Sequence, residues 1–177
     1  MRIPIRGLIA IALFGAAVLA APVSAQKIDT ATRNSNRAQL GAILADAGPN
    51  AGMEFKQSSE NPYNYSAFLT TGLSTAESVE VVVGATDSDT IFVRAFPKYK
   101  GNYVNVAKVK DPALLARRLL ALSPRTFMFW ATDESGDIYY GFTFTLESGF
   151  PREAIRIVIR SIANHDQYLT EIKALLE

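Results

Sequence analysis

The 177-residue chain contains no cysteine and only one histidine, His165. A chain without thiols has no cysteine nucleophile, and it cannot assemble the cysteine and histidine sets that usually bind zinc. The sequence also lacks a nucleophile elbow, a phosphate-binding loop and a dinucleotide fingerprint. We therefore expect a protein that is not an enzyme, with no catalytic residue, no metal and no cofactor.

The chain has no excess charge of either sign, because 18 Lys and Arg residues balance 17 Asp and Glu residues. No block of like charge stands out, whereas proteins that bind nucleic acid concentrate basic side chains on one surface. We therefore expect no nucleic-acid partner. Asp133, Glu134 and Asp137 do cluster, but they flank a Ser-Gly turn, where acids favour turn geometry, so a functional role for them is not preferred.

No apolar run is long enough to span a membrane. The longest, residues 7–20, is shorter than the roughly 20 residues that a transmembrane helix needs. Two arginines precede this run and a Val-Ser-Ala sequence follows it, which is the pattern of a secretory signal peptide. We therefore predict a signal peptide over residues 1–25, cleavage after Ala25, a periplasmic or secreted protein, and no stable membrane anchor.

The rest of the chain is the right length for one domain. Residues 26–36 are polar and without periodicity, which predicts a flexible leader followed by a single domain over residues 37–177. Periodicity and turn signals then predict a helix from Arg37 to Gly48-Pro49, strands over residues 63–71, 78–86 and 90–98, a helix opened by Asp111-Pro112, a hairpin over residues 127–146, and a long helix after Pro151.

This order of elements predicts an α+β fold, in which an antiparallel sheet of about five strands carries helices mainly on one face. The alternative is a cone-shaped α+β fold like that of the nuclear transport factor 2 superfamily, with a pocket between the sheet and the helices. In the last helix Asp166 falls within the apolar stripe. Either the helix breaks near Asn164, with Asp166 capping a second segment, or a carboxylate is partly buried. We favour the break, because an unpaired buried charge is costly.

The register of the first hairpin follows from its apolar residues. A three-residue loop over residues 87–89 pairs Val83 with Val93 and Ala85 with Ile91, which gives one consistent apolar face. A two-residue loop would instead set an apolar side chain against Arg94. The three-residue loop is therefore predicted, and the opposite face of this hairpin carries aromatic and charged residues, among them Phe92, Arg94 and Phe96.

The second hairpin is aromatic on both faces. A two-residue loop at Ser135-Gly136 pairs Glu134 with Asp137, and the resulting register assigns five aromatic residues to the core: Phe127, Phe129, Tyr140, Phe142 and Phe144. It places Met128, Trp130 and Tyr139 on the opposite face and lays Trp130 over Gly141, where its ring would shield a strand glycine.

An open sheet face with exposed aromatic residues is a candidate contact surface. The residues predicted to bind a partner there are Phe92, Arg94, Phe96, Met128, Trp130 and Tyr139. The alternative is that a bent sheet or a helix covers this face. Replacement of Trp130 by Ala distinguishes the two, because a contact residue affects binding more than stability and a core residue mainly affects stability.

The segment over residues 105–176 resembles a known family. It contains the helix DPALLARRLLAL, the hairpin FMFWATDESGDIYYGFTFTL, and Gly149-Phe150-Pro151 before the terminal helix. This arrangement resembles the YbjN-like family of bacterial sensory transduction regulators, which are similar in fold to type III secretion chaperones. The family brings no active site to carry over. The first hairpin strand is more aromatic than the family pattern, so a shared partner does not follow.

The resemblance and the aromatic face together predict a non-catalytic, exported binding module that is chaperone-like or regulatory. Its partner would be another protein or a second copy of the chain. The alternatives are a small-molecule carrier or enzyme with an internal pocket, and a structural subunit of the cell envelope.

Overall fold

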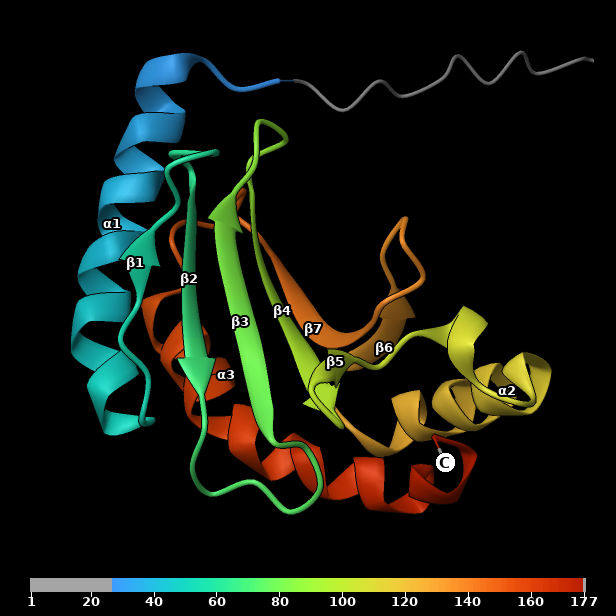
Figure 1. Cartoon of the computed structure of the whole chain (residues 1–177). Coiled ribbons are helices and arrows are strands. Elements are labelled where there is room, and N and C mark those ends of the chain that lie inside the picture. Colours follow the sequence, from blue (N-terminus) through green and yellow to red (C-terminus); the bar gives the residue numbers. More distant parts are fainter. Residues whose placement is uncertain (1–26, 177) are drawn as a thin grey trace, which may run out of the picture.

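The computed structural model describes residues 27–176 and shows an α+β fold (Figure 1). The predicted signal peptide lies outside the described residues. The helices are α1 (Thr30–Asn50), α2 (Pro112–Leu122) and α3 (Arg152–His165). The strands are β1 (Lys56–Gln57), β2 (Asn64–Leu69), β3 (Ser78–Ala85), β4 (Thr90–Tyr99), β5 (Asn102–Tyr103), β6 (Phe129–Thr132) and β7 (Ile138–Thr145). Short 3-10 helices cover Val106–Lys108, Ser123–Arg125, Asp166–Glu171 and Lys173–Leu175.

The strands form one antiparallel sheet in the order β1-β2-β3-β4-β7-β6, and β5 pairs with the end of β4. Five strands have four or more residues, and β1 and β5 have two each. The predicted fold class, an antiparallel sheet with helices mainly on one face, is confirmed. In Figure 1, α1 and α3 pack across the same face of the sheet, and α2 lies beside β6.

The face of the sheet under α1 and α3 is the covered face, and it forms the core. The predicted register of the first hairpin is confirmed, because Val83 pairs with Val93 and Ala85 with Ile91. These side chains are almost completely buried. Burial of each valine or isoleucine side chain stabilises the fold by about 2 kcal/mol, so the β3–β4 hairpin is central to the fold.

The predicted register of the second hairpin is wrong by one residue. Phe129 pairs with Gly141, and Trp130 pairs with Tyr140. A slip of one residue moves every side chain of a strand to the other face. Trp130 and Met128 are therefore core residues, 6% and 1% exposed, whereas Phe127 and Phe129 are 50% and 39% exposed. On β7 the assignment holds, because Tyr140 and Phe144 are buried and Phe142 packs against the core.

The slip arises from the turn, which has three residues instead of two. The Asp133 carboxylate accepts hydrogen bonds from the backbone N–H groups of Ser135 and Asp137, each at 2.9 Å. Gly136 closes the turn with a φ of +82°, a left-handed conformation that glycine adopts without strain. Trp130 consequently does not lie over Gly141. The strand glycine that an aromatic ring does cover is Gly84, beneath Phe92.

Helix α1 begins at Thr30, so the prediction of a flexible leader over residues 26–36 is wrong for residues 30–36. Asp29 caps the helix by accepting a hydrogen bond from the backbone N–H of Thr32 at 2.7 Å. Two polar side chains then attach this first part to the first hairpin. Arg33 Nε donates to the carbonyl of Ala85 at 3.0 Å, and Asn36 Nδ2 donates to Asp89. The start of α1 is thus fixed by polar contacts, and the spacing of apolar residues in the sequence does not reveal them.

The last helix does not break as predicted: α3 ends at His165, close to Asn164, but a 3-10 helix follows directly, and the alternative of a buried carboxylate is the one that holds. Asp166 does not cap that segment, and its carboxylate is fully buried. It accepts hydrogen bonds from the backbone N–H groups of Ser74, Thr75 (2.6 Å) and Ala76 (2.9 Å), in the loop before β3. Three donors offset the cost of burying the charge. Asp166 therefore ties the end of α3 to the sheet.

Candidate functional site

The face of the sheet opposite α1 and α3 is not crossed by any helix of the described chain (Figure 1). We call it the open face. The register places on it, among others, Lys56, Ser66, Phe68, Glu80, Val82, Phe92, Arg94, Phe96, Lys98, Tyr103, Phe129 and Tyr139. Most of these side chains are partly or fully exposed, and Phe68 is 50% exposed. Large apolar side chains that gather at a surface are typical of contact sites.

The rings of the open face contact one another in a chain across the strands. The centroid of Phe96 lies 5.3 Å from that of Tyr139 and 6.3 Å from that of Tyr103. Tyr139 in turn lies 6.1 Å from Phe129 in an edge-on arrangement. Such aromatic pairs contribute about 0.5–1.5 kcal/mol beyond the area they bury. The rings therefore hold one another in place before any partner binds.

Two cations lie on these rings. The Arg94 guanidinium is 4.8 Å from the ring centroid of Phe92 and 5.2 Å from that of Tyr139. The Lys98 ammonium is 4.3 Å from the ring of Tyr103 and 4.9 Å from that of Phe68. Neither cation forms an ion pair within residues 27–176. Their hydrogen-bond donors are available to acceptors from outside the chain.

The one acid among the open-face residues is already engaged. Glu80 accepts a hydrogen bond from the Tyr103 hydroxyl. Burial, and then this bond to Glu80, raise the pKa of Tyr103 well above its usual range, so the hydroxyl keeps its proton and remains a donor. Although Glu80 and Arg94 are diagonal neighbours in the register, Arg94 lies on its rings instead.

Four of the six predicted contact residues, Phe92, Arg94, Phe96 and Tyr139, lie together on the open face, although Tyr139 is buried there, 8% exposed. The other two, Met128 and Trp130, belong to the core, so their assignment as contact residues is wrong. The prediction missed four residues that take part in the ring and cation contacts of this face: Phe68, Lys98, Tyr103 and Phe129. Phe68 was detectable, because strand alternation sets it against the buried Ala67 and Leu69. Phe129 could be placed on this face only by recognising that the second hairpin has a three-residue turn.

The covered face has a polar cluster of its own at the end of α3. His165 stacks on Tyr140 with centroids 5.7 Å apart, and its Nδ1 donates to the carbonyl of Ser161 at 3.0 Å. Burial lowers the pKa of His165, partly offset by the hydrogen bond to Ser161. The imidazole is therefore neutral at pH 7. In the described chain its Nε2 has no hydrogen-bond partner, and neither has the buried Nε1 of Trp130.

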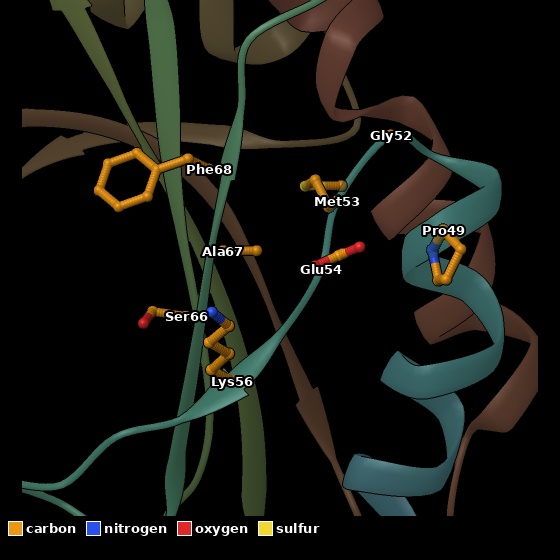
Figure 2. Close-up of a pocket in the computed structure, with 8 residues that line it drawn as sticks. All are labelled: Pro49, Gly52, Met53, Glu54, Lys56, Ser66, Ala67 and Phe68. Carbon is orange, nitrogen blue, oxygen red and sulfur yellow. The ribbon is translucent and has the colours of Figure 1, made fainter.

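A hollow of about 690 Å³ opens at the β2 edge of the sheet. Figure 2 shows the segment with Gly52, Met53 and Glu54 diverging from the strand that carries Phe68. The hollow is lined by Pro49, Gly52, Met53, Glu54, Lys56, Ser66, Ala67 and Phe68. It thus lies where the short β1 leaves the longer β2, next to the open face.

Among residues 27–176, no group of three or more His, Asp or Glu side chains is placed to hold a metal ion. Within the same range, no helix has the length and apolar character needed to cross a membrane. The acids of the second hairpin turn are used in the turn itself, as Asp133 shows. No protein-family model matches the chain, and no curated protein matches it significantly.

Proposed function

We propose that this chain is an exported, non-catalytic binding module that captures a polypeptide partner on its open face. The observation that carries the proposal is the pair of cations, Arg94 and Lys98, that lie on aromatic rings without an acidic partner in the described chain. Aromatic side chains and arginine are the residues that most often dominate binding energy at protein interfaces. The rings supply apolar area, and the cations supply directed hydrogen bonds.

Export rests on the signal pattern of residues 1–25. The resemblance to the YbjN-like family, and a chaperone-like or regulatory role, remain part of this proposal. They are supported by the order of elements, in which three longer strands are followed by α2, a hairpin and α3. The partner is either another protein or a second copy of the chain.

The alternative of a carrier or enzyme with an internal pocket needs space between the sheet and the helices. In the described chain, that space is filled by aliphatic side chains from both layers, such as Val81, Val93, Leu40 and Ile159. Ligand sites of this kind are cavities of about 300 Å³ or more with convergent polar groups. The open face is therefore the better supported site.

The experiment compares capture of periplasmic proteins by immobilised wild-type protein, Phe96→Ala and Arg94→Ala, with light scattering to measure self-association. Each variant should weaken the captured complex, or the dimer, about tenfold or more, which corresponds to about 1.4 kcal/mol. The matched control is Leu120→Ala, because Leu120 is exposed on α2, away from the open face. Equal binding by all four proteins would contradict the proposal.

A further inference from the structure

Strand β2 has one edge that its neighbour covers only in part. Against β3 it pairs along its whole length, from Asn64 to Leu69. Against β1 it pairs only at Tyr65 and Ser66, because β1 has two residues. The second half of β2 is therefore a sheet edge without a strand beside it.

The direction of the backbone groups on that edge follows from two hydrogen bonds. The carbonyl of Tyr63 accepts from the N–H of Ala85, the last residue of β3, and the carbonyl of Asn64 accepts from the N–H of Ser58, which follows β1. Successive residues of an antiparallel strand alternate between the two neighbours. The N–H and C=O groups of Phe68 consequently face outward, into the hollow, as those of Asn64 do.

Residue Glu54 would be the partner of Phe68 if β1 continued in register, since Lys56 pairs with Ser66. The chain is instead held against α1. The N–H of Met53 donates to the carbonyl of Gly48 at 2.9 Å. The ring of Phe55 lies so close to Gly48 that an added Cβ would be 2.9 Å from it. The segment before β1 is thus fixed away from β2, and the hollow separates Glu54 from Phe68 (Figure 2).

We propose that this hollow is a strand-addition site, which takes a short extended segment of a partner polypeptide beside Phe68. An unpaired strand edge presents N–H and C=O groups at the spacing of another extended backbone, so the occupant is a polypeptide and not a small molecule. The site is distinct from Arg94 and its rings, and the inference holds whether or not the open face binds a partner.

The side chains around the edge define what the added segment carries. Side chains of a strand point alternately to the two faces of its sheet. On the open face the added strand meets Phe68, which is half exposed. An apolar residue of the added strand at this position would therefore strengthen binding. On the covered face the added strand meets Met53 and Ala67, which form an apolar surface at the base of the hollow. Glu54 and Lys56 line the side of the hollow opposite β2, and they carry one charge of each sign.

The test uses a phage-displayed library of random eight-residue peptides, selected on the full exported chain. The enriched peptides are then synthesised and bound to the protein during amide hydrogen exchange measured by NMR. In the free protein the Phe68 amide should exchange faster than that of Leu69, whose N–H faces β3. A bound peptide should slow exchange at Phe68 about tenfold or more and leave Leu69 unchanged.

Two variants separate the backbone bond from the side chain. Phe68→Pro removes the outward N–H without removing a bond to β3, and proline is tolerated at sheet edges. Phe68→Ala removes the ring and keeps the N–H. Peptide binding should be abolished by Phe68→Pro and only weakened by Phe68→Ala. An Arg94→Glu variant should bind the peptides as the wild type does, because Arg94 lies on the open face and not at this edge.

Several results would overturn the inference. Selection that enriches no peptide, or peptides that bind Phe68→Pro as well as Phe68→Ala, would show that the edge does not receive a strand. Protection of Phe68 in the free monomer would mean that residues 52–55 close the gap themselves. Protection that appears together with a dimer in light scattering would assign the edge to a second copy of the chain. If Phe68→Pro does not fold, the exchange measurement on the wild type decides.

Discussion

The two faces of the sheet teach more about this protein than either face alone. The covered face presents Val79, Val81, Val83, Ile91 and Val93 to α1 and α3, and all of them are fully buried. The open face alternates rings with charged groups and keeps half of Phe68 in solvent. Each face is made by the alternate residues of the same strands, so the difference shows which residues the fold requires and which remain for contact.

The largest expected effect on stability comes from comparing substitutions at two neighbouring residues of β6. Trp130→Ala should lower the free energy of unfolding by about 3–5 kcal/mol, because it leaves a cavity beside Tyr140 in the core. Phe129→Ala, on the open face, should cost about 1 kcal/mol or less. Urea unfolding monitored by circular dichroism measures both. If the two costs were reversed, the β6 register described here would be incorrect.

The next effect concerns the buried anchor of the covered side. Asp166→Asn should destabilise the protein by about 3 kcal/mol, because in either orientation the amide NH2 faces a backbone N–H group, that of Ala76 or those of Ser74 and Thr75. The control is Thr170→Val, which removes only an exposed hydroxyl contact to Thr75 in the same loop. Thr170→Val should cost about 0.5 kcal/mol. Equal costs in thermal or urea unfolding would show that Asp166 is not an anchor.

A smaller, pH-dependent effect is expected from His165. Its pKa is lowered in the folded protein by burial, so below the unfolded pKa of 6.5 the unfolded chain binds more protons than the folded chain. Stability should therefore fall as the pH drops from 6.5 through the folded pKa. The groups that face the imidazole are the rings of Phe127, Tyr140 and Tyr168 and the carbonyl of Ser161.

Comparison with a His165→Gln variant isolates this contribution. Urea unfolding at pH 7.5, 6.5, 5.5 and 4.5 should show a steeper loss of stability for the wild type than for the variant over the acidic range. Parallel curves for the two proteins would show that His165 titrates normally. The open-face residue Arg94 should leave the pH dependence unchanged when it is replaced by alanine.

The smallest effect on stability belongs to the open face. Arg94→Ala should change the free energy of unfolding by no more than about 1 kcal/mol, because it removes only cation–π contacts at a partly exposed site. The same variant should reduce partner binding about tenfold. If Arg94→Ala unfolded readily but bound the partner normally at low temperature, Arg94 would be a structural residue and not a contact residue.

The two hairpins show how much of this structure could be predicted from the sequence. Both have the same three-residue turn, in which a side chain at the first position, Thr86 or Asp133, accepts from the N–H groups two and four residues on. The first register was predictable because only one choice avoided setting an apolar residue against Arg94. The second was not, because its strands are aromatic on both faces and either register buries rings.

The signal that apolar alternation missed in the second hairpin lies in the turn chemistry. Gly136 occupies the left-handed position that closes a three-residue turn, and Asp133 supplies the acceptor. Long-range polar contacts had no local signature at all. The bond of Arg33 to Ala85 and those of Asp166 to the loop before β3 join residues far apart in the sequence. Such contacts decide where helices begin and end without altering hydrophobic periodicity.

The most direct test of the open face uses a photo-crosslinking amino acid placed at one position at a time in the exporting cell. Sites at Phe96 and Phe129 sample the open face, and a site at Ile157 samples the exposed side of α3. Crosslinks to one defined polypeptide from Phe96 and Phe129, absent from Ile157 and lost with Arg94→Glu, are the predicted result. Equal crosslinking from all three sites, or crosslinks from Ile157 alone, would contradict the assignment of function to the open face.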